Sequence, residues 1–106
     1  MLFKGVSAFG GQVEGKICIV HDHEEFSHCE EDDIVLLVGV KPNAELVRRV
    51  KAVLAVHGGI TSHAAITARE NNKPSVVGIK EDILNYINNG DKVVINADEG
   101  LVELLK

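Results

Sequence analysis

The sequence lacks several features that mark specialised classes of protein. No apolar run approaches the roughly 20 residues that a membrane-spanning helix needs. The N-terminal residues lack the long apolar region of a secretory signal peptide. The formal net charge is −5, and no basic face is evident that could neutralise nucleic-acid phosphates. We therefore expect a cytoplasmic protein that binds neither membranes nor nucleic acids.

Linkers, internal repeats and low-complexity segments are also missing. The 106 residues suffice for one compact domain with a modest core and are too few for two. The apolar content of 45% is that of an ordinary globular protein rather than a disordered one. We therefore expect residues 1–106 to form a single folded domain.

Cysteine is scarce, with only Cys18 and Cys29 in the chain. The two could pair in principle. Because no export signal is present, we expect two free thiols in a reducing cytosol instead. Cys18 lies within an apolar run, so we expect it to be a small buried residue of the core.

The apolar pattern predicts strands that alternate with helices in the middle of the chain and cluster towards its ends. Within residues 13–20, Ile17 and Ile19 should face one side and Cys18 and Val20 the other. The predicted strands are 13–20, 33–38, 52–56, 75–78, 92–96 and 101–105, and the predicted helices are 44–50, 64–71 and 81–87. This order indicates an α/β fold with extra β structure.

Two details refine that prediction. Residues 33–38 are apolar enough to be buried on both sides, and Asn43 is a suitable N-cap for the helix that follows. The polar segment 21–32 is expected to be a loop with one helical turn at most.

The segment 52–66 carries the strongest functional signal. A short apolar strand leads to Gly58-Gly59, then to Thr61 and Ser62, and then to His63 at the start of a helix. Glycine lets backbone N–H groups approach an anion closely. The first N–H groups of a helix have no internal partner and carry partial positive charge, so a phosphate is stabilised there.

The same helix dipole disfavours the imidazolium form of His63, leaving a neutral ring whose lone pair can attack phosphorus. An alternative is that His63 is an ordinary residue of the first helical turn, with Thr61 or Ser62 as the N-cap.

Residues 58–78, GGITSHAAITARENNKPSVVG, resemble the phosphohistidine signature of the PEP-utilising enzymes. This family includes pyruvate phosphate dikinase, phosphoenolpyruvate synthase and enzyme I of the sugar phosphotransferase system. Further similarity at residues 5–16, 33–36 and 90–100 extends the resemblance over nearly the whole chain. The resemblance implies a swivelling β/β/α domain in which His63 is transiently phosphorylated, through Nε2.

The chain also departs from the pattern of these relatives. Val56-His57 stands where they often carry an acidic residue or glutamine before the glycine pair. The run Gly39-Val40-Lys41-Pro42 has no threonine, although relatives often have one shortly before the matching proline. Phe9-Gly10 stands where relatives often have Ser-Pro.

Other residues have two interpretations each. In pyruvate phosphate dikinases the threonine that matches Thr61 is a regulatory phosphorylation site, but capping or phosphate contact is the simpler role here. Arg69 could reach a phosphate or a partner through its long stem, or form a salt bridge with Glu70, Asp98 or Glu99. Four ligand-type residues could in principle form a metal site, namely His21, His23, His28 and Cys29. Their acidic neighbours favour a solvated loop, so we expect no metal there.

These observations favour a phosphoryl carrier, and the resemblance implies the phosphohistidine component of a PEP-utilising phosphotransferase of the PEP synthase or dikinase type. His63 is the expected catalytic residue. The residues expected to bind phosphate or support it are Gly58, Gly59, Thr61, Ser62 and Arg69.

The chain has no Walker-type loop and is too short for a nucleotide-binding domain or a PEP-binding barrel. We therefore expect it to bind no cofactor and to be inactive alone, with Mg²⁺ at the site of a nucleotide-binding or PEP/pyruvate-binding partner. The expected docking surface includes Ile60, Ala64 and Ala65. The alternative is a regulatory or scaffolding module of the same fold.

Overall fold

The computed structural model describes residues 1–57 and 62–105. Along the chain the elements are β1 (Leu2–Lys4), β2 (Val6–Phe9), β3 (Gln12–Val20), the 3₁₀ helix η1 (His23–His28), β4 (Asp33–Val38), α1 (Ala44–Arg49), β5 (Ala52–Val56), α2 (His63–Glu70), β6 (Ser75–Ile79), the 3₁₀ helix η2 (Glu81–Asn85), β7 (Lys92–Asn96) and β8 (Leu101–Leu104). This is a small mixed α/β domain, as the sequence predicts.

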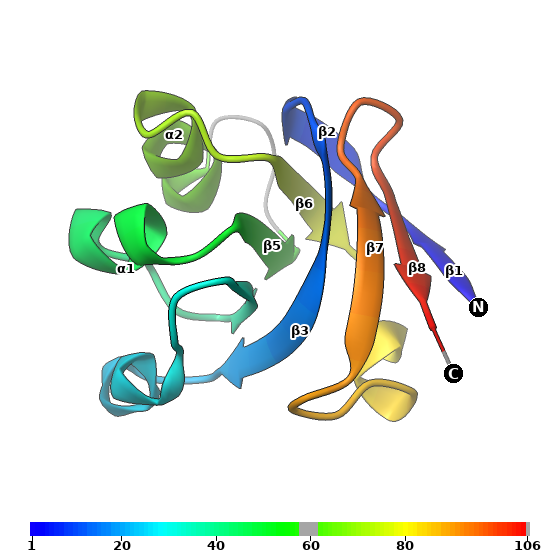
Figure 1. The fold of residues 1–106 in the computed structure, drawn as a ribbon, viewed down its shortest axis with the longest axis horizontal. Coiled ribbons are helices and arrows are strands. Elements are labelled where there is room, and N and C mark those ends of the chain that lie inside the picture. The colour runs from blue at the N-terminus through cyan, green and yellow to red at the C-terminus, as the bar shows by residue number, and fades with distance from the viewer. Residues whose placement is uncertain (58–61, 106) are drawn as a thin grey trace.

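A single sheet of eight strands, in the order β1-β8-β7-β3-β4-β5-β6-β2, organises the described residues. The four central strands β3, β4, β5 and β6 are parallel, whereas every other pairing is antiparallel. Figure 1 shows α1, α2 and η1 on one face of the parallel strands and η2 on the other. The parallel strands are therefore covered on both sides, which explains their nearly continuous apolar sequences.

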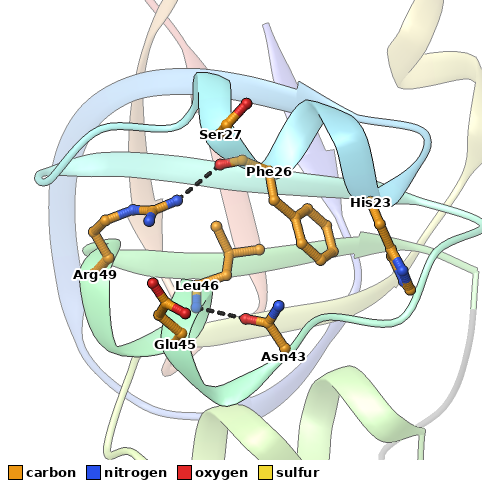
Figure 2. Close-up of a pocket in the computed structure, with 7 residues that line it drawn as sticks. All are labelled: His23, Phe26, Ser27, Asn43, Glu45, Leu46 and Arg49. Carbon is orange, nitrogen blue, oxygen red and sulfur yellow. Dashed lines mark hydrogen bonds between the residues drawn. The ribbon is translucent and has the colours of Figure 1, made fainter.

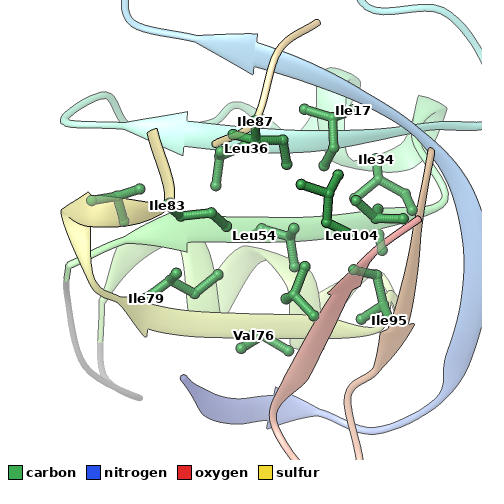
Figure 3. Packing of buried hydrophobic residues seen from close by; sticks show 14 of the residues in the cluster. Ile17, Ile34, Leu36, Leu54, Val76, Ile79, Ile83, Ile87, Ile95 and Leu104 are labelled. Carbon is green, nitrogen blue, oxygen red and sulfur yellow. The ribbon is translucent and has the colours of Figure 1, made fainter. Parts of the chain in front are cut away.

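Two apolar layers sandwich the central strands. In β4, Ile34 and Leu36 pack with the layer that β7, β8 and η2 complete, whereas Val35 and Leu37 pack under the helices. Figure 3 shows the first layer, in which Ile83 and Ile87 meet side chains from the sheet. The predicted split of β3 is confirmed, because Ile17 and Ile19 lie on the first layer and Cys18 and Val20 on the second.

The N-terminal segment forms two strands that the sequence analysis did not predict. β1 pairs with β8 at one edge of the sheet, and β2 pairs with β6 at the other. Only Gly5 separates the two strands, so residues 2–9 connect both edges (Figure 1). The backbone N–H of Gly5 donates to the Gly100 carbonyl at 2.8 Å, which anchors the crossing point.

Most other predicted elements are confirmed with small shifts at their ends. β4, β5 and β7 have the predicted bounds, and Asn43 is the N-cap of α1, with Oδ1 accepting from Leu46 N at 2.8 Å. The segment predicted as a helix over 81–87 is a shorter 3₁₀ helix over Glu81–Asn85. The described helices are all too short or too polar to cross a bilayer.

The prediction of two free thiols is wrong, because Cys18 and Cys29 form a disulfide with a Cα–Cα distance of 5.7 Å. Cys18 is buried, as predicted, and so is Cys29. The prediction of free thiols was based on the expected cellular compartment. Whether two cysteines can pair depends on the distance between them, which the fold sets. η1 turns the chain back after β3, which brings Cys29 beside Cys18, near the end of that strand.

Candidate functional site

The site lies where β5 ends and α2 begins. β5 is wholly buried, and its last residue is followed by His57, which adopts a left-handed backbone with φ of 66°. The His57 N–H donates to the Ile79 carbonyl at 3.0 Å, and the His57 carbonyl accepts from Gly78 N at 2.9 Å. These two bonds hold the exit of β5 against the end of β6.

The predicted phosphate-binding residues Gly58, Gly59 and Thr61 lie outside the described residues, as does Ile60. Their predicted roles, including regulatory phosphorylation of Thr61, stay predictions.

Ser62 is the N-cap of α2. Its backbone is extended, its Oγ accepts a hydrogen bond from Ala65 N at 3.3 Å, and its carbonyl accepts from Ile66 N at 3.0 Å. Of the two capping residues considered from the sequence, the structure therefore assigns this role to Ser62.

His63 is the first residue of α2 and is exposed. Its ring makes no hydrogen bond to any described residue, and its carbonyl accepts from Thr67 Oγ1 at 2.8 Å. The backbone N–H groups of His63 and Ala64 have no partner among the residues described. Among the described residues, the start of α2 thus presents two donors without a partner beside an exposed imidazole.

A shallow pocket of about 310 Å³ opens beside His63. It lies at the carboxyl ends of the parallel strands β4 and β5, the edge at which open α/β sheets bind ligands. No acidic side chain contributes to its described lining, and Lys41 is the cationic one. The lining residues are Leu37, Gly39, Val40, Lys41, Pro42, Ala55, Val56, His57, Ser62, His63 and Ala64.

His57, which follows β5, also lines this pocket. Its Nε2 lies 3.2 Å from Glu81 Oε2, and both side chains are largely exposed. In the sequence, His57 stands out only as a departure from the pattern of the relatives, and its contact with Glu81 was not predicted.

Arg69 has a role that sequence reasoning missed. Its side chain is half-buried, and Nε donates to the Ala8 carbonyl at 2.9 Å, joining α2 to β2. Asp98, one of the acidic partners considered for it, accepts a hydrogen bond from Gly11 N at 3.1 Å. Arg69 therefore helps to hold the first strands of the chain, and its predicted contact with a phosphate stays a prediction.

The predicted docking surface is partly wrong. Ala64 and Ala65 are 6% and 0% exposed, because they belong to the face of α2 that packs on the sheet. The exposed apolar residue next to His63 is Ile66, at 45% exposure and three residues further along the helix.

The described contacts of the histidine-rich segment 21–29 hold the fold together and do not form a ligand site. His21 Nδ1 lies 3.4 Å from Glu25 Oε1, and the backbone N–H of His21 lowers the pKa of Glu25 by donating to it. The His23 ring packs on Phe26 at 5.0 Å, and Cys29 is committed to the disulfide. Within residues 1–57 and 62–105, no group of three or more ligand-type side chains could hold a metal.

A second hollow, of about 300 Å³, lies between η1 and α1 (Figure 2). Arg49 Nη2 donates to the Phe26 carbonyl at 2.7 Å across it. At its other end, Asn43 Oδ1 accepts from Leu46 N in the N-cap of α1. Cationic Arg49 and anionic Glu45 both line this hollow, together with the apolar Phe26 and Leu46. None of the predicted site residues lies there.

Comparison with solved structures supports the fold. An N-terminal enzyme I structure is 30% identical, with a TM-score of 0.60 over 74% of this chain and 33% of that one. Aconitase X from Thermococcus kodakaraensis overlaps 100% of this chain and 99% of its own with a TM-score of 0.73, but at 18% identity it shows the fold alone.

Comparison with curated proteins extends this likeness to sequence. A probable phosphoenolpyruvate synthase from Pyrococcus horikoshii is 33% identical over 103 residues, which are 96% of this chain but only 12% of the relative. Residues 29–100 match the family described as the mobile domain of PEP-utilising enzymes. With this match over most of its length, the chain belongs to the family of PEP-utilising enzyme mobile domains.

Proposed function

We propose that this chain is a phosphoryl carrier, in which His63 accepts a phosphoryl group from one site and passes it to another. The observation that carries the proposal is an exposed histidine, the first residue of a capped helix, in a chain of this family. A neutral imidazole with a free lone pair is a competent nucleophile. The N–H groups of His63 and Ala64, which have no partner among the described residues, favour the dianionic product.

The chemistry needs more than this chain offers. Phosphoryl transfer requires in-line geometry and cations that neutralise the transferring group. The chain spans only 12–15% of the relatives named as phosphoenolpyruvate synthases. We therefore place the donor and acceptor sites, with Mg²⁺, on a nucleotide-binding domain and a PEP- or pyruvate-binding domain or subunit. His63 must then move between them, as expected of a swivelling domain.

The surface that meets those partners includes His63 and Ile66. Both are exposed, and residues three apart share one face of a helix. An apolar side chain beside the reactive ring lets a partner exclude water from the phosphoryl group while it is transferred.

The alternative is a regulatory or scaffolding module that docks to a partner without catalytic transfer. The overlap with aconitase X supports this alternative, because it shows that the fold also occurs in a protein named for another activity. A carrier must release its phosphoryl group rapidly to an acceptor, whereas a signalling module should retain it.

The test is phosphorylation by candidate partners. The chain is incubated with a partner subunit, Mg²⁺ and labelled ATP or phosphoenolpyruvate, and the adduct is tested for acid lability and base stability. We expect label on wild type and on the control His21→Ala, none on His63→Ala, and loss of label within seconds when acceptor is added. Label that persists on His63→Ala contradicts the assignment, and rapid autophosphorylation without a partner contradicts a carrier that depends on one.

A further inference from the structure

The loop that joins β4 to α1 places a lysine in the pocket beside His63. Lys41 and His63 line the same pocket, although they are 22 positions apart in the sequence. They line one pocket because β4 and β5 are parallel neighbours, so the loop after β4 and the start of α2 emerge at the same edge of the sheet.

The backbone on both sides of Lys41 is well defined. Gly39 takes a left-handed conformation with φ of 68°, which turns the chain sharply at the end of β4. Pro42 is buried, and Asn43 caps α1 immediately afterwards. Lys41 thus projects an exposed side chain from a short segment held at both ends.

The charges around the pocket suit an anion. The whole chain carries a formal charge of −5, yet the described lining of this pocket contains no carboxylate. Outside the lining, Glu81 contacts the lining residue His57, with Oε2 at 3.2 Å from Nε2. Lys41 forms no salt bridge with any of the described residues, so its ammonium group is available to an incoming anion.

We propose that Lys41 binds the phosphoryl oxygens of the group carried on His63 and lowers the barrier to its transfer. The inference rests on the proposed function, because it assigns Lys41 a role only if His63 is phosphorylated. The ammonium group supplies a positive charge that complements the backbone N–H groups at the start of α2. The carrier then brings one cation of its own to each partner site.

The step can be followed with phosphoramidate, a small donor that needs no partner protein. The donor reacts in its zwitterionic form, in which its nitrogen already carries three hydrogens. The His63 lone pair forms an N–P bond, the P–N bond of the donor breaks, and that nitrogen leaves as ammonia with the electron pair. The other ring nitrogen keeps its proton until solvent takes it. Charge and atoms balance without a metal or a second protein, so the rate reports on groups of this chain.

The experiment measures the rate of His63 labelling by phosphoramidate, with the labelled histidine identified by mass spectrometry. The variants are Lys41→Gln, Lys41→Arg and the matched control Lys92→Gln, whose exposed lysine lies on β7 outside the pocket. His63→Ala identifies the label, and labelling of exposed His21 in each variant provides an internal reference.

We expect Lys41→Gln to slow labelling of His63 by about three- to tenfold at low salt, the effect of one nearby charge that water partly screens. Lys41→Arg and Lys92→Gln should stay within about twofold of wild type. The loss should shrink towards nothing near 1 M salt, where the Debye length falls to about 3 Å. A structural role for Lys41 would not show this salt dependence.

Two outcomes overturn the inference while leaving the proposed function intact. One is labelling of His63 in Lys41→Gln at the wild-type rate at low salt. The other is an equal loss in Lys41→Gln and Lys41→Arg that salt does not change, which would indicate altered packing. If wild type is never labelled on His63, by phosphoramidate or by partners, the proposed function fails and this inference fails with it.

Discussion

Gly5 packs so closely against Gly100 that Gly100 has no room for a side chain, and Gly5 has none because it packs against β6. A Cβ on Gly100 would lie 2.6 Å from the Gly5 carbonyl oxygen, and one on Gly5 would lie 2.5 Å from the Val77 carbonyl oxygen. The N–H of Gly5 donates to the Gly100 carbonyl at this point. The N-terminal segment can cross from β8 to β6 only because both positions are glycine.

We therefore expect Gly5→Ala to destabilise the domain by about 2 kcal/mol or more, because the added methyl must push the backbone of β6 away. The matched control is Gly90→Ala, where φ is 88° but the Cβ meets nothing within 4 Å, and there we expect about 1 kcal/mol of backbone strain alone. Urea unfolding measures both changes. Equal costs at the two positions would contradict steric exclusion at Gly5.

The disulfide gives a second prediction. Cys18 and Cys29 are 11 positions apart, and closing so short a loop stabilises the folded state by about 2–3 kcal/mol. Reduction, or the double change Cys18→Ser and Cys29→Ser, should lower the free energy of unfolding by that amount. The double variant should not respond to reductant. Two free thiols per chain, titrated after unfolding without reductant, would contradict the pairing.

Arg69 should contribute to stability through its bond to the Ala8 carbonyl. Arg69→Lys removes the Nε donor while keeping the charge, so we expect a loss of about 1 kcal/mol and faster amide exchange in β2. Hydrogen exchange followed by NMR measures this directly. The control is Arg48→Lys, an exposed position on α1, which should leave exchange in β2 unchanged. Unchanged exchange in Arg69→Lys would show that this bond does not hold β2.

Glu25 should stabilise the fold at neutral pH and lose this effect in acid, although exposure of its carboxylate keeps the effect small. The His21 backbone N–H donates to its carboxylate and lowers the pKa from the ordinary value of 4.5. A carboxylate whose pKa is depressed in the folded state stabilises the fold above the unfolded pKa and loses that effect as pH falls through the folded pKa.

The difference in stability between wild type and Glu25→Gln should therefore vanish at the acidic end of a titration that starts at pH 7. NMR titration of the Glu25 side chain measures the shift itself. A folded-state pKa at or above the ordinary value would contradict the hydrogen bond from His21.

The buried strands were the most predictable part of the fold. β4 and β5 are covered on both faces, so their sequences are apolar apart from Asp33 at the start of β4, and polar or glycine residues mark their ends. β1 and β2 escaped prediction because each has only three or four residues and carries exposed apolar side chains such as Leu2 and Val6. Their positions depend on pairing with distant strands, which a local pattern does not encode.

The site was predictable in its order along the chain but not in its surroundings. The start of α2 and its cap follow from local residue preferences, and Ser62 and His63 appear where they were expected. Lys41 and His57 join them only through the parallel pairing of β4, β5 and β6. The prediction that Ala64 and Ala65 lie at the surface was wrong for a geometric reason. When His63 faces solvent, the next two residues of the helix point towards its packed side.

The pairing of β1 with β8 has a mechanical consequence. Leu104 N donates to the Met1 carbonyl at 2.8 Å, and Leu2 lies opposite Glu103, so the first and last residues of the sheet sit at the same end of one antiparallel ladder. Tension applied to both ends of the chain would load these rungs one after another, as in opening a zipper, rather than shearing them together. The ladder should therefore open at low force, starting with the bond between Leu104 and Met1.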